Sequence, residues 1–178
     1  MPRLPPAVPL RGAPSRRWAA LAETSLAARA LPKVDYFDVF STSVGPDVTL
    51  EEAARRVFSG RPSRLMRLRD ALVRPFGLKT SPRGSRPVPH FVPGERVGLF
   101  TLFQRTEEEL LLGADDRHLD FRVSLRVAGG EASLATAVRF RNNFGRAYFF
   151  CIRPFHALLV QGMLRRATQP RARRKASR

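Results

Sequence analysis

The sequence predicts an α+β domain in which a curved antiparallel sheet wraps around one long C-terminal helix. Three observations predict this class. Alternating apolar and polar residues flank Gly129-Gly130, which is typical of two strands joined by a tight turn. Apolar residues then recur at helical spacing over 144–167. The order of elements gathers the helices on one side of the sheet.

The first elements are a strand and two short helices. Residues 34–44 mix aromatic and β-branched side chains, which predicts the first strand. Thr49 begins a capping box with Glu52, and the apolar spacing that follows predicts a helix over 50–58. A second helix is expected over 63–76 on the same grounds.

A long connection and four strands follow. Residues 77–95 are rich in Pro and Gly, so we expect a long loop that is either mobile or functional. Hairpins are then expected over 97–114 and 118–141. In the second hairpin, alternation predicts that Phe121, Val123 and Leu125 are buried, and that their neighbours Arg122, Ser124 and Arg126 are exposed.

The last predicted element is a long helix over 144–167. Pro154 lies inside it and is expected to kink it, because its ring removes one backbone hydrogen bond. Cys151 lies among apolar neighbours, which predicts a buried and unreactive thiol. Against the sheet, the helix is expected to enclose a cavity, with the loop over 82–93 as its lid.

Charge and composition divide the chain into three parts. We expect a flexible Pro/Arg/Ala-rich segment over 1–33, one domain over 34–168 and a basic disordered tail over 169–178. Residues 1–33 carry +5 and residues 165–178 carry +7 of the net charge of +17, so the middle is only mildly basic. The arginine and alanine bias is typical of a GC-rich bacterial genome. A weak contact of the tails with acidic lipid or nucleic acid is the alternative interpretation.

Several classes of protein are excluded or disfavoured. The single cysteine excludes an internal disulfide, and the apolar run over 154–164 is shorter than a transmembrane segment. Residues 1–33 lack a continuous apolar stretch typical of a secretory signal, so a cytoplasmic protein is expected. No metal site is expected, because the three histidines are scattered. No dinucleotide is expected, because G-x-G-x-x-G is absent, and the sequence suggests no other cofactor.

A dense group of charged residues with one histidine precedes and enters the fourth predicted strand. In it, Asp116 or Asp120 could orient His118 as a general base. The alternatives are a ligand contact at the mouth of the cavity, or a purely structural turn followed by ion pairs on the polar face of a strand, which the pattern favours. The candidate polar cluster is Asp116, Arg117, His118 and Asp120.

The other candidate residues line the expected cavity. His156 and Tyr148 would be polar hooks for a ligand if they face it, and otherwise hydrogen-bond to backbone at the edge of the sheet. The expected ligand-binding residues, from the strands and the long helix, are Phe121, Val123, Leu125, Thr136, Val138, Tyr148, Phe155, His156 and Leu159.

Five segments carry a resemblance to a known family: VDYFD over 34–38, RDALVRPFGL over 69–78, DDRHLDFR over 115–122, VRFRN over 138–142 and RPFH over 153–156. With them the chain resembles the bacterial domain-of-unknown-function family 2867 over about 34–168. The resemblance supplies no catalytic residue. The order of elements resembles the helix-grip fold of the START and Bet v 1-like superfamily, which implies hydrophobic ligands held between sheet and helix.

Three functions remain open at this level. The first is a binding module for a hydrophobic small molecule in the cavity. The second is a cyclase- or dehydratase-like enzyme that uses polar groups in the same pocket, so enzymatic activity is undecided, although binding is favoured. The third is an interaction or regulatory domain with a basic tail and no ligand. Convergence of His118, His156 or Tyr148 into the cavity would favour catalysis.

Overall fold

The computed structural model describes residues 24–58 and 89–168. The predicted second helix, most of the long loop and both ends of the chain lie outside the described residues. The described elements, in chain order, are α2 (Leu26–Arg29), β1 (Tyr36–Ser43), α3 (Leu50–Phe58), β2 (Arg96–Val97), β3 (Phe100–Arg105), β4 (Glu109–Asp115), β5 (Leu119–Ala128), β6 (Glu131–Phe140) and α5 (Asn143–Ala167).

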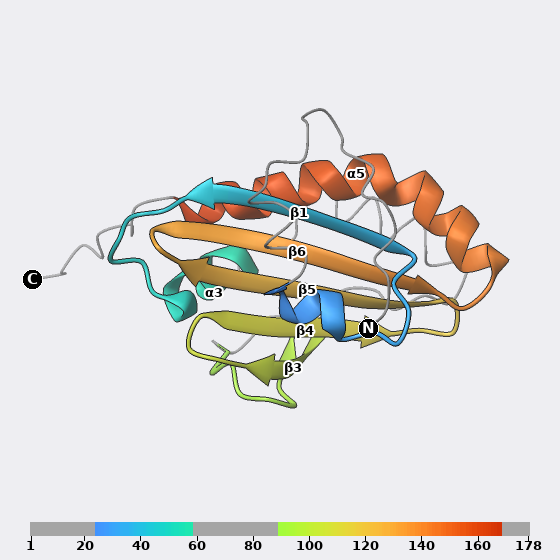
Figure 1. Cartoon of the computed structure of the whole chain (residues 1–178), viewed down its shortest axis with the longest axis horizontal. Helices are drawn as coiled ribbons and strands as arrows, with labels where there is room; N and C mark the ends of the chain where they lie inside the picture. Colours follow the sequence, from blue (N-terminus) through green and yellow to red (C-terminus); the bar gives the residue numbers. More distant parts are fainter. Residues whose placement is uncertain (1–23, 59–88, 169–178) are drawn as a thin grey trace, which may run out of the picture.

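The strands form one antiparallel six-stranded sheet in the order β1-β6-β5-β4-β3-β2. Strands β3 to β6 are successive hairpins, and β1 pairs along its whole length with β6 at one edge of the sheet. Gly129 and Gly130 have φ of 58° and 73°, which the tight β5–β6 turn requires. Helix α5 lies along one face of the curved sheet (Figure 1), so the predicted α+β class is confirmed.

The predicted strand over 97–105 is divided in two. Gly98 has a φ of 70° and interrupts it, so that β2 folds back on β3 with Val97 opposite Phe100. This split supplies the sixth strand. Its position next to β3 places it at the edge of the sheet opposite β1.

The inner face of the sheet is the one that α3 and α5 cover. Side chains alternate along each strand, so every second residue of the sheet points to this face. Arg56 on α3 donates a 2.8 Å hydrogen bond to the carbonyl of Ala167, which joins the ends of the two helices. The core includes Val57, Phe58, Leu102, Leu110, Leu112, Val123, Leu125, Leu134, Val160 and Leu164.

The outer face is covered in its middle by α2. Ala27 and Leu31 are almost fully buried there, against Leu111, Ala135 and Ala137 of the sheet. The flexible segment predicted over 1–33 is therefore wrong for residues 26–31. Small alanines on β6 allow the short helix to approach the sheet closely, and apolar side chains on that face require cover.

The same cover corrects the prediction for β5. Val123 and Leu125 are buried on the inner face as predicted, but Arg122 and Ser124 are also buried, with exposures of 8% and 1%. Both faces of β5 are packed because α2 covers the outer one. The polar side chains are accommodated there by partners: Ser124 donates to the buried Glu109 carboxylate, and Arg122 lies on the Phe103 ring.

Helix α5 extends over 25 residues and curves along the sheet (Figure 1). It is the one helix among the described residues that is long and apolar enough, by length and composition alone, to cross a membrane. Phe149, Ala157, Val160 and Leu164 are nevertheless buried. One side of α5 is thus part of the protein core.

Candidate functional site

Five polar side chains meet between the inner face of the sheet and α5, and we call them the inner polar site. Tyr36 and Asp38 come from β1, and alternation places both on the inner face. Thr136 lies directly opposite Asp38 on β6. Arg153 and His156 are three residues apart, so they share one side of α5. The pairing of the edge strand β1 with β6 under one helix therefore creates the site.

The Asp38 carboxylate is the centre of the inner polar site. The hydroxyl of Tyr36 donates a 2.6 Å hydrogen bond to Asp38 Oδ2. His156 Nε2 lies 3.3 Å from the same oxygen, within ion-pair distance but without hydrogen-bond alignment. The exposed fractions of the Asp38 and His156 side chains are only 13% and 9%. A phenol, a carboxylate and an imidazole are thus held together away from bulk water.

Aromatic rings surround this polar centre. The Tyr36 ring lies 4.6 Å from that of Phe149, and the His156 ring lies 6.2 Å from those of both Phe121 and Phe149. The Arg153 guanidinium lies 5.5 Å above the Tyr36 ring, a cation–π arrangement. The site therefore combines a polar centre with an apolar wall.

Several polar atoms of this region are buried without a hydrogen-bond partner in the described part of the chain. They are Asp38 Oδ1, Thr136 Oγ1, Tyr148 OH, Arg153 Nε and His156 Nε2. Each buried polar atom left unpaired costs about 1–3 kcal/mol, and such atoms are rare in folded proteins. Four of the five belong to the inner polar site, so hydrogen-bonding capacity there exceeds what the described residues use.

Burial raises the pKa of Tyr36 well above its ordinary value, and the neighbouring Asp38 carboxylate raises it further. The Tyr36 hydroxyl therefore keeps its proton throughout the physiological range. It is fixed as a donor to Asp38, which leaves the second carboxylate oxygen as an acceptor for another group.

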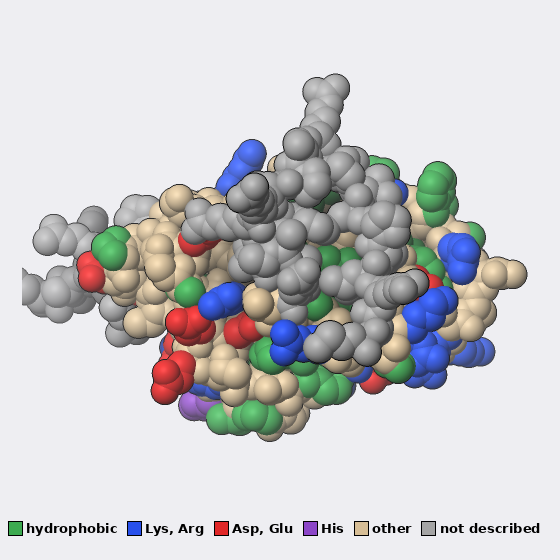
Figure 2. Space-filling model, in the orientation of Figure 1, with side chains coloured by type: hydrophobic (Ala, Val, Ile, Leu, Met, Phe, Trp, Pro, Cys, Tyr) green, Lys and Arg blue, Asp and Glu red, His purple; other side chains and the backbone are tan. Residues whose placement is uncertain are grey.

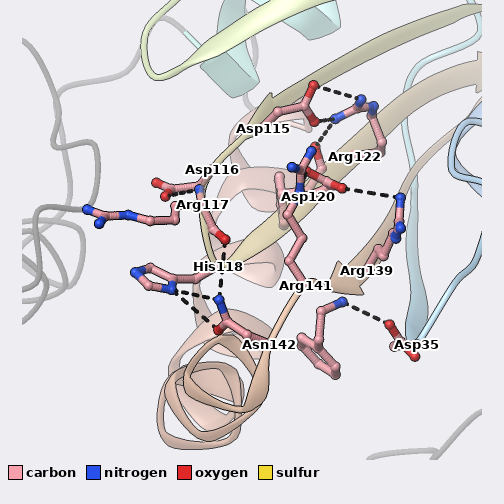
Figure 3. Close-up of polar contacts among 12 residues, drawn as sticks. Asp35, Asp115, Asp116, Arg117, His118, Asp120, Arg122, Arg139, Arg141 and Asn142 are labelled. Atoms are coloured by element: carbon pink, nitrogen blue, oxygen red, sulfur yellow. Dashed lines mark hydrogen bonds and ion pairs between the residues drawn. The ribbon is translucent and has the colours of Figure 1, made fainter.

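The predicted polar cluster lies at the end of the β4–β5 hairpin (Figure 3). His118 Nδ1 contacts the side chain of Asn142, and Asp120 accepts a 2.8 Å hydrogen bond from Arg141. Asp116 accepts from the backbone of its neighbour Arg117. Asn142 also caps α5 by accepting from Gly145 N at 3.0 Å. These contacts join the hairpin to the start of α5.

A second ion pair completes the surroundings of that cluster. Arg122 donates to both oxygens of Asp115, at 2.6 and 3.3 Å. This hydrogen bonding holds the pKa of Asp115 below its ordinary value. Asp120 also lies 3.9 Å from Arg139 (Figure 3). Asp115 and Asp120 are thus engaged with arginine side chains and Asp116 with a backbone N–H, whereas the ring-nitrogen contact of His118 is with an amide.

The expected ligand-binding residues divide into three groups. Thr136, His156 and Phe121 are brought together at the inner polar site, and the hydroxyl of Tyr148 is buried two turns before His156 on α5. Phe155 is instead 42% exposed, because it lies on the side of α5 away from the sheet. The remaining residues are buried or half-buried: Val123, Leu125, Val138 and Leu159.

The sequence reasoning missed three members of the site: Tyr36, Asp38 and Arg153. A signal for each was present, since Tyr36 and Asp38 alternate in a predicted strand and Arg153 precedes His156 by one helical turn. The sequence did not indicate which strand pairs with this first strand. Only the pairing of β1 with β6 places Asp38 beside Thr136.

No curated protein and no solved structure matched the chain in comparison. A family model, described as protein of unknown function (DUF2867), matches residues 30–163. The match includes β1 with Tyr36 and Asp38, and extends through His156 to most of α5. The inner polar site thus lies wholly within the matched region, and the chain belongs to the DUF2867 family.

Proposed function

We propose that this protein binds a small molecule with an apolar body and a hydrogen-bonding end between the inner face of the sheet and α5. The observation that carries the proposal is the set of unpaired buried polar atoms on Asp38, Thr136, Arg153 and His156. Small-molecule sites combine apolar walls with a few convergent polar groups. The helix-grip resemblance supports the same interpretation.

The chemistry of the site indicates which molecule it suits. Asp38 Oδ1 accepts, Arg153 Nε donates, and Thr136 and His156 do either. A hydroxyl or carbonyl group satisfies such a mixed set better than a second carboxylate, which Asp38 would repel. The rings of Phe121 and Phe149 suit a ring or hydrocarbon body. The favoured ligand is therefore an uncharged amphipathic molecule rather than a purely apolar one.

Binding is tested by native mass spectrometry of the purified protein and by titration with an uncharged hydroxynaphthalene probe. We expect a stoichiometry near one. Thr136→Val keeps the shape of the side chain but removes its hydroxyl, and should weaken probe binding about tenfold. Asp38→Asn should act similarly, whereas Asp47→Asn at an exposed position is the control. Absence of any bound molecule and of probe binding would refute the proposal.

Acid–base catalysis of the cyclase or dehydratase type is the second candidate. The 3.3 Å approach of His156 Nε2 to an Asp38 carboxylate that Tyr36 also contacts favours it, because a carboxylate beside an imidazole stabilises the imidazolium that forms on proton transfer. In a dehydration, His156 would take a proton from the carbon next to a carbonyl. The electrons of that C–H bond form a C=C bond as hydroxide leaves, and a proton returned by the imidazolium completes water.

Binding and catalysis are separated by the variant His156→Asn. A binding module loses affinity for the hydroxynaphthalene probe, whereas an enzyme also loses turnover of a β-hydroxycarbonyl compound. Turnover is followed by the ultraviolet absorbance of the conjugated product. If a panel of such compounds is not converted by the unaltered protein, the catalytic candidate is rejected and the binding proposal stands on its own test.

A further inference from the structure

The side of α5 that faces away from the sheet is unusually apolar for an exposed surface. Phe150 is 76% exposed, Leu158 is 61% exposed and Phe155 is 42% exposed. Phe155 and Leu158 are neighbours at a spacing of three residues, and the exposure of all three side chains places them on the side of the helix that faces away from the sheet. Four of the six large exposed apolar side chains of the described residues lie on α5, including Phe144. We call Phe150, Phe155 and Leu158 the outer stripe.

Cys151 lies beside this stripe and is also exposed. The prediction of a buried thiol is therefore wrong. The apolar neighbours that suggested burial belong to the exposed stripe itself. An isolated exposed apolar residue needs no explanation, but a contiguous group on one helix marks a surface that binds something apolar.

The charged residues along α5 all have the same sign. From Asn142 to the end of the chain there is no Asp or Glu and there are nine Arg and Lys. Arg146 precedes the stripe, with its guanidinium 5.8 Å from the Phe140 ring, and Arg165 follows the stripe; both side chains are exposed. Figure 2 shows Lys and Arg side chains gathered at the right, at the end of the molecule where α5 begins. An anionic partner is therefore complementary in charge to both ends of the outer stripe.

We propose that the outer stripe binds the surface of a membrane that contains anionic lipids, with α5 lying in the plane of the interface. Phenylalanine and leucine side chains insert between the lipid headgroups, and arginines at both ends contact the phosphates. The apolar stripe distinguishes this partner from nucleic acid, because Leu158 and Phe150 contribute nothing to binding a phosphate backbone. The basic residues distinguish it from an uncharged apolar partner.

The helix lies on the membrane and does not cross it. Although α5 is long and apolar enough to span, Phe149, Ala157 and Val160 are buried in the protein. A spanning helix would have to leave this packing and the 2.8 Å hydrogen bond between Arg56 and Ala167. With the fold intact, only the outer side of α5 is free to contact lipid. This surface is separate from the inner polar site on the other side of the helix.

The single cysteine allows a direct test on the full-length protein. A polarity-sensitive fluorophore is attached to Cys151, and vesicles are added that contain equal parts of phosphatidylcholine and phosphatidylglycerol. We expect co-sedimentation and a blue shift of the emission, both reduced by high salt. Vesicles of phosphatidylcholine alone should bind weakly. Unlabelled protein is sedimented in parallel to show that the fluorophore does not cause binding.

Variants separate the apolar from the electrostatic contribution. Phe150→Ser combined with Leu158→Ser should weaken vesicle binding about tenfold or more. Arg146→Gln and Arg165→Gln should each weaken it about fivefold. Val92→Ser, at a position that is 53% exposed and distant in the chain from α5, is the matched control and should bind normally. Melting temperatures confirm that each variant is folded.

Four results would overturn the proposal. The first is no binding to the anionic vesicles, and the second is binding that the outer-stripe variants leave unchanged. The third is retention in the membrane after alkaline carbonate extraction, which indicates a spanning helix. The fourth is a Cys151 thiol that does not react in the folded protein, since another part of the chain then covers the stripe. Binding to an oligonucleotide without a blue shift on vesicles counts as the first result, because the protein then does not bind the anionic vesicles.

Discussion

Replacing Ser124 by alanine removes one hydrogen bond from a buried carboxylate on the outer face of the sheet. Glu109 is 7% exposed and Ser124 is 1% exposed. The Ser124 hydroxyl donates to Glu109 Oε1, which also accepts a 2.8 Å hydrogen bond from the backbone N–H of Leu26. The carboxylate thus joins β4 to β5 and to the start of α2.

The expected cost follows from the charge and burial of the acceptor. A hydrogen bond to a charged group contributes about 1.5–3 kcal/mol, and no water replaces the lost hydroxyl at a buried position. With an m-value of about 2 kcal/mol per molar urea, the unfolding midpoint of Ser124→Ala should fall by roughly 1 M. Glu109→Ala should cost at least as much, because Leu26 also loses its acceptor.

Urea unfolding followed by circular dichroism measures these effects. Ser41→Ala, at an exposed position of β1, is the control and should change the free energy of unfolding by less than about 0.5 kcal/mol. A double-mutant cycle between Ser124 and Glu109 should give a coupling energy of about 1.5–3 kcal/mol. Equal midpoints for Ser124→Ala and Ser41→Ala would refute the claim that the outer face of β5 is packed.

Three further predictions follow from the structure. Gly162→Ala should stabilise the protein by about 0.5–1 kcal/mol, since a Cβ at this position meets nothing within 4 Å. Gly145→Ala should destabilise the protein, because a Cβ there collides with the His118 carbonyl. Thermal melting compares the two variants. Above about pH 10 the free energy of unfolding should fall by up to about 1.4 kcal/mol per pH unit, because the unfolded state loses the Tyr36 proton that the folded state retains. Tyr36→Phe should remove this slope in urea titrations at about pH 9 and 11. Deleting residues 1–33 should lower the unfolding midpoint markedly, because α2 leaves the outer face; a midpoint unchanged by the deletion would contradict that packing.

Local pattern in the sequence determined most of the elements. The predicted helix over 144–167 differs by one residue from α5, and the Gly129-Gly130 turn lies where it was expected. The capping hydrogen bond from Glu52 N to Thr49 Oγ1 is present at 3.2 Å. These features depend on residues within a few positions of one another. Their periodicity and capping chemistry can therefore be interpreted without knowledge of the fold.

The tertiary structure decided which sides of those elements are covered. Alternation in β5 indicates that Arg122 and Ser124 share a side, but not that α2 covers it. Likewise, helical spacing places Phe155 and His156 on different sides of α5 without showing which side meets the sheet.

The inner polar site was also decided by the tertiary structure. Tyr36 and Asp38 precede His156 by more than a hundred residues, and they meet only because β1 pairs with β6 beneath α5. Sequence periodicity shows which residues point the same way, because that depends on local backbone geometry. Which of those surfaces come into contact depends on strand pairing and helix packing between distant segments, and these are properties of the whole folded chain.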